Sequence, residues 1–214
     1  MKMLNYDTLD STNEEAKRLW HAGELSALSC VTAAHQSAGK GTQGRVWVSP
    51  KNAGLYFTVV HIPSILSKGG GDSVWPLSAD WTLAAGVACA EALQAELNLT
   101  VQLKPVNDLY AEGKKLGGIL VESIIEEDVL KVLFTGIGIN VCNTERVIAD
   151  SAISPVSLEA LLPPHQFERL QTETLLKALA SSVDVWYQRL QADRTTVIAT
   201  YEKYQLPGTE LQYV

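Results

Sequence analysis

The sequence predicts an α+β domain: a mixed, largely antiparallel β-sheet with helices packed against it. Strand and helix patterns both occur along the 214 residues, but short strand-to-strand links outnumber strand–helix–strand units. The polar turn at residues 126–128 joins two long strand patterns and is typical of a hairpin. Apolar residues make up 46% of the chain, which is enough for one compact domain with a sizeable core.

The first strand and the first helix are marked by their ends. Leu4–Leu9 alternates weakly between apolar and polar residues, which favours a strand. The polar run Asp10–Asn13 follows, and Ser11 and Glu14 have the spacing of a capping box. Gly23 is predicted to end a helix of about three turns, because glycine readily adopts the left-handed conformation that closes helices.

The remaining elements follow from apolar runs and their period. Pro76–Leu97 is predicted to be the longest helix, and its many alanines indicate close packing against a sheet. The chain is mainly helical from Ser157 onward, where an apolar stripe that includes Trp186 indicates a core helix. Pro63–Ser73 is predicted to be an exposed, flexible loop. Further strands are expected over Leu28–His35, Gly54–Ile62, Val101–Lys104, Leu116–Ile125 and Val129–Asn140.

Composition and charge argue against several classes of protein. A formal net charge of -7 argues against a general nucleic-acid binder, which needs an excess of Lys and Arg. No segment approaches the roughly 20 apolar residues that cross a bilayer, and the N-terminus does not resemble a signal peptide. The cysteines Cys30, Cys89 and Cys142 are widely spaced, which favours reduced core thiols over a disulfide frame or metal site. We therefore expect a soluble, cytoplasmic protein with no nucleic-acid or membrane partner.

A glycine loop between two predicted strands is the first candidate site. Residues 38–50 read AGKGTQGRVWVSP and contain the pattern G-x-G-x-x-G. A dinucleotide-binding loop opens a helix, whereas this loop runs into β-branched residues and Pro50, which favour extended chain. Walker A and protein-kinase motifs do not occur. The loop is either a cationic lid that brings Lys40 and Arg45 to an anionic ligand or a solvated hairpin tip, and its sequence alone favours neither.

A second polar cluster lies at the mouth of a buried strand. Residues 104–122 read KPVNDLYAEGKKLGGILVE, with two adjacent lysines followed by a pair of glycines. Lys104 precedes proline, so its backbone should be extended, and Asn107 and Asp108 form a polar pair before a turn. A lysine with two glycines behind it can reach a ligand that lies close to the backbone. The alternative is an exposed hairpin with a charged turn.

Six stretches, in order and spacing, resemble the biotin protein ligases of the biotin/lipoate protein ligase family. They are DSTN at 10–13, HQSAGKGTQGRVWVSP at 35–50, GLYFT at 54–58, KPVND at 104–108, GKKLGGILVE at 113–122 and TGIGINV at 135–141. The resemblance covers about residues 4–142 and is weaker in the helical tail. It implies the catalytic fold of that family, which is similar to that of class II aminoacyl-tRNA synthetases.

The resemblance implies a two-step reaction that uses biotin, ATP and Mg²⁺. The biotin carboxylate attacks the α-phosphate of ATP and gives biotinyl-5′-AMP and pyrophosphate. A lysine amine of a biotin carboxyl carrier protein, a domain of acetyl-CoA carboxylase or a related carboxylase, then attacks this mixed anhydride. Cationic side chains would screen the repulsion between the two anions, and a closing loop would protect the anhydride from water.

The resemblance also implies roles for the matching residues. The catalytic set is Lys115, Arg45, Lys40 and Asp108, in which Lys115 would hold the carboxylate and Asp108 would orient the incoming amine. The biotin-binding set is Ser11, Thr12, Asn13, Gln36, Gly39, Lys40, Gly41, Lys115, Gly117 and Gly118. The nucleotide-binding set is Arg45, Trp47, Lys104, Asn107 and Asn140. The residues alone leave open that Ser11 is a helix cap, Trp47 a core residue and Asn140 a turn residue. No residue is assigned as a metal ligand.

Departures from the family pattern bear on activity and domain organisation. Lys40 and Thr42 stand where the family loop commonly has arginines, so a clamp on the adenylate is lost at Thr42. KPVND replaces the family's KWPND, which alters the wall beneath the nucleotide. We expect a catalytic domain over residues 1–204, only the start of a C-terminal β-barrel over 205–214, and no N-terminal DNA-binding domain. The expected state is a monomer or weak homodimer.

Two other functions remain open from the sequence. A lipoate or octanoate acyltransferase would need a longer, narrower apolar tunnel in place of a site for a ureido group. A non-catalytic protein that binds biotin, the adenylate or the carrier would follow if the altered loop and the missing barrel had abolished activity.

Overall fold

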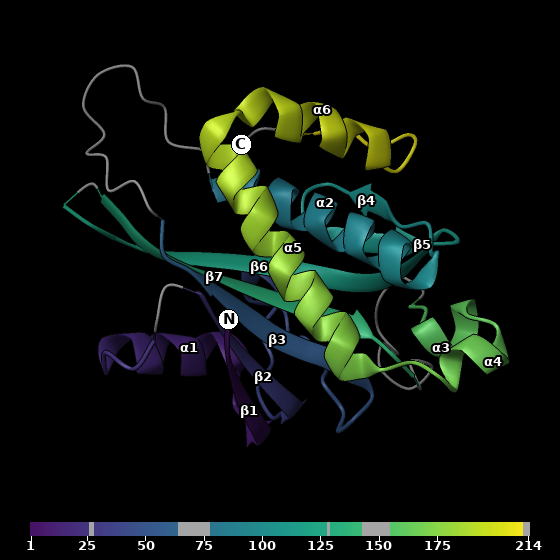
Figure 1. Cartoon of the computed structure of the whole chain (residues 1–214), viewed down its shortest axis with the longest axis horizontal. Helices are drawn as coiled ribbons and strands as arrows, with labels where there is room; N and C mark the ends of the chain where they lie inside the picture. Colours follow the sequence, from purple (N-terminus) through teal and green to yellow (C-terminus); the bar gives the residue numbers. More distant parts are fainter. Residues whose placement is uncertain (26–27, 64–77, 128, 143–154, 212–214) are drawn as a thin grey trace.

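The computed structural model describes residues 1–25, 28–63, 78–127, 129–142 and 155–211 (Figure 1). Across these residues seven strands form one sheet in the order β1-β2-β3-β7-β6-β5-β4. β1 runs parallel to β2, and all other neighbours are antiparallel, which confirms the predicted fold class. The strands are β1 (Lys2–Leu9), β2 (Leu28–Gln36), β3 (Gly54–His61), β4 (Gln102–Lys104), β5 (Asp108–Ala111), β6 (Lys114–Glu126) and β7 (Val129–Asn140).

Helices cover both faces of the sheet. Figure 1 shows α2, α5 and α6 gathered on one side of it and α1 on the other. Trp186 of α5 is 2% exposed and belongs to the core, as its apolar stripe predicted. The helices are α1 (Thr12–His21), α2 (Ser78–Leu97), α3 (Leu158–Leu161), α4 (Pro164–Phe167), α5 (Thr172–Ala192) and α6 (Arg194–Tyr204), and a 3-10 turn (Thr42–Gly44) lies in the glycine loop.

The central strands serve both faces because successive side chains of a strand point in opposite directions. In β3, Val59 packs in the larger core with α2 and α5, whereas Val60 packs in the smaller core beneath α1. In β7, Leu133 and Phe134 divide in the same way. Beyond Phe134, the face of β7 that points toward α1 therefore carries residues that do not pack in either core.

The start of α1 differs from the prediction, whereas its end agrees. Ser11 is the N-cap residue, but its side chain makes no capping hydrogen bond. Glu14 cannot complete a capping box because its carboxylate accepts hydrogen bonds from Lys17 and Lys40 instead. At the other end Gly23 has a φ of +72°, and its N–H donates to the carbonyl of Trp20 in a Schellman-type closure.

The predictions for the remaining elements hold with two differences. The strand β5 was not predicted, because its four residues begin with the polar Asp108 and end at the tight turn Glu112–Gly113, where both φ angles are positive. After α6, Leu206 donates its N–H to the carbonyl of Leu103, and residues 206–211 contain no strand. The assignment of this tail to a barrel stays a prediction. The expected loop at 63–73 lies, apart from Pro63, outside the described residues.

Three predictions from composition can be compared with the structure. Cys30 and Cys89 are buried free thiols, whereas Cys142 is only partly buried. Among the described residues, no three His, Cys, Asp or Glu side chains are grouped as a metal site would require. No helix in this part of the chain has the length and apolar character needed to cross a membrane.

A buried histidine links the sheet to α5. His61 is 3% exposed, and its Nδ1 lies 2.9 Å from a carboxylate oxygen of Asp184. Its ring also packs edge-on against Tyr187, with the ring centroids 5.3 Å apart. Burial lowers the pKa of His61, and Asp184 opposes this shift only in part. The imidazole is therefore neutral in the folded protein near neutral pH.

This burial predicts a loss of stability in mild acid. Below about pH 6.5 the unfolded chain binds a proton at His61, whereas the folded protein does so only at lower pH. The free energy of unfolding should therefore fall as the pH drops from about 6.5 toward the lower folded pKa, by at most about 1.4 kcal/mol per pH unit for this group. Urea unfolding of the wild type and of His61→Gln over this range would measure it. The variant His21→Gln, at an exposed position, is the control. If the free energy of unfolding of His61→Gln depended on pH as steeply as that of the wild type, His61 would not be the group responsible.

Candidate active site

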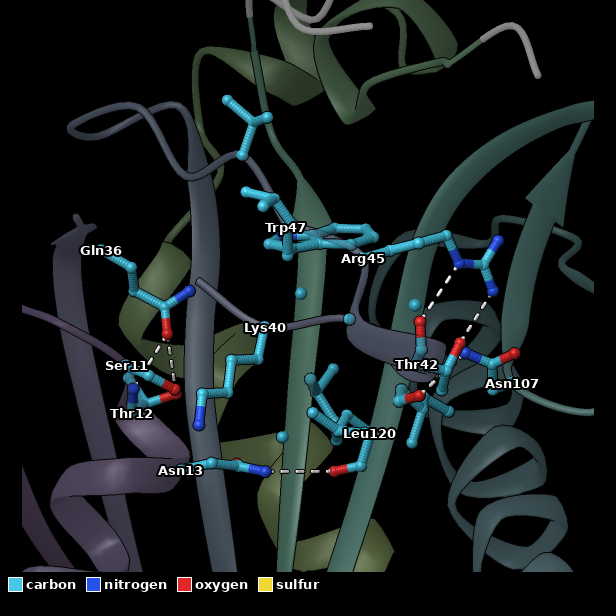
Figure 2. Close-up of a pocket in the computed structure, with 18 of the residues that line it drawn as sticks. Ser11, Thr12, Asn13, Gln36, Lys40, Thr42, Arg45, Trp47, Asn107 and Leu120 are labelled. Carbon is cyan, nitrogen blue, oxygen red and sulfur yellow. Dashed lines mark hydrogen bonds between the residues drawn. The ribbon is translucent and has the colours of Figure 1, made fainter. Parts of the chain in front are cut away.

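A cavity of about 190 Å³ lies between the glycine loop and the sheet, on the face that also carries α1 (Figure 2). β6 and β7 provide its floor, the loop provides its cover, and the start of α1 closes one end. In Figure 2, Gln36, Thr12, Asn13 and Lys40 lie at one end, and Arg45, Thr42 and Asn107 lie at the other. The cavity therefore has two chemically different ends.

The floor is flat because glycines alternate along its strands. Gly136 and Gly138 in β7 and Gly118 in β6 all face the cavity, since Ile137 and the other intervening residues point into the core. A Cβ atom at Gly138 would lie 2.5 Å from the indole of Trp47, and one at Gly136 would lie 2.6 Å from Oδ1 of Asn13. Only glycine therefore permits these side chains to lie against the sheet.

Trp47 forms the wall of the cavity above this floor. Its ring lies over Gly138 and Gly118, and the ammonium of Lys115 is 5.5 Å from its centroid. The indole N–H is buried and has no hydrogen-bond partner among the described residues. Trp47 is only partly buried and faces the cavity, which supports the ligand-facing interpretation over that of a core residue.

The end of the cavity beside α1 carries a dense set of hydrogen-bonded, uncharged side chains, next to the ion-paired Lys40. The Oε1 of Gln36 accepts from the backbone N–H of Thr12 at 2.9 Å, and its Nε2 donates to the Oγ of Ser49 at 2.8 Å. The hydroxyl oxygens of Thr12 and Thr58 are 2.9 Å apart, and Thr58 also contacts Oδ1 of Asn13 at 2.5 Å. These side chains are each less than one-tenth exposed. They form one continuous hydrogen-bonded chain across the end of the cavity.

The partners in this chain fix which atoms donate. Oδ1 of Asn13 cannot donate, so the single Thr58 proton goes to it, and Thr12 donates in turn to Thr58 or to Gln36. Oxygen atoms with unused lone pairs therefore remain at this end. The hydroxyl of Ser11 is different, because it makes no capping hydrogen bond to α1 and can donate to a ligand.

The glycine loop folds over the cavity as a small hairpin. The N–H of Gly41 donates to the carbonyl of Arg45, and the N–H of Trp47 donates to the carbonyl of Gly39. A Cβ atom at Gly39 would collide with the backbone carbonyl oxygen of Trp47. The 3-10 turn at the tip ends at Gly44, whose φ is +72°. Gly39 therefore shapes the loop and does not line the cavity.

Ion pairs attach this loop to α1. The ammonium of Lys40 lies 2.8 Å from a carboxylate oxygen of Glu14, and Lys17 contacts the same oxygen at 2.9 Å. Hydrogen bonds from Lys40 and Lys17 lower the pKa of Glu14, so this carboxylate stays ionised. At the other end of the loop the guanidinium of Arg45 donates to the hydroxyl and carbonyl oxygens of Thr42. Lys40 thus points toward α1 and away from Arg45.

The opposite end of the cavity carries a partly buried cation. Lys115 is 15% exposed, and its ammonium lies 2.7 Å from a carboxylate oxygen of Asp108, which is 13% exposed. The backbone around it is held by Asn140, whose amide donates to the carbonyl of Lys115 at 3.3 Å and to that of Val156 at 3.1 Å. Asn107 donates to the carbonyl of Ile119. Lys115 is therefore a preformed anchor for an anion.

The structure brings most of the sequence-predicted residues to one cavity. Those that line it are Ser11, Thr12, Asn13, Gln36, Lys40, Gly41, Arg45, Trp47, Asn107, Lys115, Gly118 and Asn140. Asp108 acts on the cavity through Lys115. Lys104 and Gly117 do not line it: the ammonium of Lys104 lies over the ring of Tyr110, and Gly117 faces Leu109 on the other side of the sheet.

Several lining residues were missed by the sequence reasoning. They are Val46, Val48, Ile119, Leu120, Gly136, Ile137, Gly138 and Pro155. The alternating glycines of TGIGIN at 135–140 were a usable signal, because glycine at every second residue of a strand leaves one face bare. Pro155 had no such signal, since it reaches the cavity through a bridge to Lys115 across the fold.

Comparison with known proteins identifies the family. Residues 6–140 match the model of the biotin/lipoate A/B protein ligase family. The chain belongs to this family. A biotin–[acetyl-CoA-carboxylase] ligase of Paracoccus denitrificans is 32% identical over 188 residues, which cover 85% of this chain and 71% of the relative. The bifunctional ligase/repressor BirA of Bacillus subtilis is 32% identical over 140 residues. The match covers 65% of this chain but only 40% of the length of that relative.

Solved structures of the family share this fold. A biotin protein ligase from Aquifex aeolicus in complex with biotin and ATP has a TM-score of 0.74 at 23% identity. The match covers 96% of this chain and 78% of the Aquifex chain. A biotin protein ligase from Leishmania major in complex with biotin has a TM-score of 0.70 at 24% identity, with coverage of 100% and 84%. The fold expected from the resemblance is therefore confirmed.

The ion pair between Lys40 and Glu14 predicts a measurable tether on the loop. Glu14→Gln should speed hydrogen exchange of the backbone amides at 39–46 by roughly twofold to fivefold, as expected for a partly exposed ion pair. Lys51→Gln, which breaks the exposed ion pair with Asp7, is the matched control and should leave these amides unchanged. Exchange in Glu14→Gln that equals the wild-type rate would show that the ion pair does not restrain the loop.

Proposed function

We propose that this protein is a biotin protein ligase, which activates biotin with ATP to biotinyl-5′-AMP and transfers it to a lysine of a carrier domain. The observation that carries the proposal is the division of one cavity into a hydrogen-bonded end, where Lys40 is held by Glu14, an apolar floor, and an end that carries Lys115 and Arg45. Biotin has the same order of groups, with a ureido head, a hydrocarbon chain and a carboxylate. Relatives that are biotin ligases, one of them solved with biotin and ATP, point to the same substrates.

The hydrogen-bonded end suits a cyclic urea. A urea has two N–H donors beside one carbonyl acceptor. The free lone pairs around Thr12 and Asn13 can accept from the N–H groups, and the hydroxyl of Ser11 can donate to the carbonyl. The bicycle and chain would then cross the glycine floor beneath Trp47, where a side chain at Gly138 would block them.

The cationic end suits the carboxylate and the phosphate that it attacks. The carboxylate of Asp108 lies beside the ammonium of Lys115, where a substrate carboxylate could also bind. A biotin carboxylate would replace it, and one of its oxygens would form a bond to the α-phosphorus as the bond to pyrophosphate breaks. Lys115 and Arg45 would reduce the repulsion between these anions and stabilise the charge that moves onto the leaving oxygen.

The second step would use the carboxylate of Asp108, which is released from Lys115 when the substrate binds. The carrier amine attacks the acyl carbon, the bond between that carbon and the AMP oxygen breaks, and the nitrogen loses a proton. Asp108 is near Lys115 and would be free to orient the amine or accept the proton. The loop that carries Lys40 and Trp47 would meanwhile limit the access of water to the anhydride.

Magnesium fits this site as a companion of the nucleotide. Within the described residues there is no group of three potential carboxylate, imidazole or thiolate ligands. Mg²⁺ commonly binds through substrate phosphates with few protein ligands, and Asn107 and Asp108 have side-chain oxygens at that end that could contact its hydration shell. When bound, the ion would neutralise phosphate charge.

The proposed partner is the biotin carboxyl carrier domain of acetyl-CoA carboxylase or a related carboxylase. A lipoate or octanoate ligase is the alternative, because the matched family model covers lipoate ligases as well. The hydrogen-bonded end favours biotin, since a dithiolane or methyl end offers no N–H group to its oxygens. Calorimetry with both acids would separate the two.

Removal of the Lys115 ammonium tests the proposal. The protein with biotin, MgATP and an apo-carrier should yield a streptavidin-detectable product, and Lys115→Ala should lower the rate at least about a hundredfold, as for other electrostatic groups at a transition state. Lys114→Ala is the matched control, because this neighbouring lysine is exposed and lies outside the cavity lining. No labelled carrier with the wild type would overturn the proposed function, and a fully active Lys115→Ala would overturn the role of Lys115.

The threonine in the loop predicts weak retention of the adenylate. Thr42 lines the cavity, but its hydroxyl is already bonded to Arg45 and carries no charge. Thr42→Arg should slow the release of biotinyl-5′-AMP by about tenfold, which corresponds to one charge-assisted hydrogen bond. Rapid filtration of protein loaded with radiolabelled biotin and ATP would measure the rate. Thr42→Ser, which keeps the hydroxyl, is the control; equal release from Thr42→Arg and the wild type would refute the explanation.

A further inference from the structure

Asn13 lies at the start of α1 and lines the cavity with a buried amide group. It is 2% exposed, and its amide lies between Glu122 of β6 and Thr58 of β3. The distance from its Nδ2 to a carboxylate oxygen of Glu122 is 2.7 Å, and Nδ2 also points to the carbonyl of Leu120, 3.4 Å away (Figure 2). Glu122 does not line the cavity, so it acts on this site only through its partners.

The two oxygens of Glu122 have different partners. One accepts from Asn13, and the other lies 2.6 Å from the ammonium of Lys17. An ionised carboxylate only accepts hydrogen bonds, so the part of the Asn13 amide that faces Glu122 must be the NH₂ group. The amide oxygen is then turned toward Thr58 and Gly136, on the floor of the cavity.

We infer that Glu122 is a positioning residue for substrate selection, because it turns the Asn13 amide so that the cavity presents an acceptor to a ligand N–H. This inference rests on the proposed function and deepens it. The ligand class that it selects is a cyclic urea or a similar ring with N–H donors. A ring without N–H groups gains nothing from this acceptor and leaves it unpaired, which costs affinity.

The variant Glu122→Gln has an unusually specific expected effect. A glutamine has one oxygen and one NH₂ group, whereas Lys17 and Asn13 both donate to position 122. Because the ammonium of Lys17 requires the oxygen, the new NH₂ group would face Asn13. The Asn13 amide would then rotate and turn its own NH₂ group toward Thr58 and the cavity. The cavity would present a donor where the wild type presents an acceptor.

Binding measurements test this reversal. By titration calorimetry, Glu122→Gln should weaken biotin binding at least about tenfold, the lower range for an unpaired polar contact in a buried site. The double variant Glu122→Gln/Lys17→Met should recover most of the loss, because the glutamine oxygen is then free to face Asn13. Glu173→Gln, which removes an exposed partner of Lys177 on α5, is the matched control and should bind as the wild type does. Glu122→Gln binding within twofold of the wild type, or a double variant as weak as the single one, would overturn the inference.

The orientation of the Asn13 amide can also be measured without a ligand. In the wild-type protein the side-chain NH₂ protons of Asn13 should show nuclear Overhauser effects to the methylene protons of Glu122. In Glu122→Gln they should show them to the methyl group of Thr58 instead. An unchanged pattern would overturn the inference even if binding were weaker. If the wild type bound no biotin, the proposed function would fail, and this measurement alone would decide the role of Glu122.

Discussion

The alternation of side chains along β7 is the constraint on which the rest of the molecule depends. Ile137 and Ile139 fill the core beneath α2 and α5, while Gly136 and Gly138 between them form the floor of the cavity. A strand that served only the core would carry side chains on both faces, and Trp47 could not lie on the sheet. The same strand thus stabilises the fold and leaves room for a ligand, because its period is two residues.

The lysines of the cavity are already engaged in ion pairs within the protein. Lys40 and Lys115 line the cavity, and each is paired with a carboxylate of the protein, Glu14 and Asp108 respectively. The ammonium of Lys115 is largely buried and would be costly without a partner, so Asp108 offsets that cost. Lys40 is exposed, so its ion pair with Glu14 contributes little to stability. An anionic substrate then has to compete with these carboxylates, and its net gain is the difference between two ion pairs.

The sequence could predict elements and local motifs, but not contacts made across the fold. The strands, the long helices and the loop motifs are local patterns, and most residues matched through them reach one cavity. The capping box failed because two lysines, one of them 26 residues away, bind Glu14. Gly117 faces away from the cavity because strand parity depends on a register that a short motif does not reveal. Glu122 was invisible for the same reason, since it acts on Asn13 from 109 residues away.

The hydrogen bond from the first N–H of α1 to Gln36 ties recognition to architecture. A helix normally satisfies its leading amides with a cap of its own, whereas the first amide of α1 is bound by a side chain that also lines the cavity. Any substitution at Gln36 that changes which ligands bind would also remove the hydrogen bond to the first N–H of α1. The first turn of the helix, which follows Ser11, would then be less well ordered. Evolution of new specificity at this position would therefore require a compensating change at the helix start, so adaptation here should proceed by paired mutations.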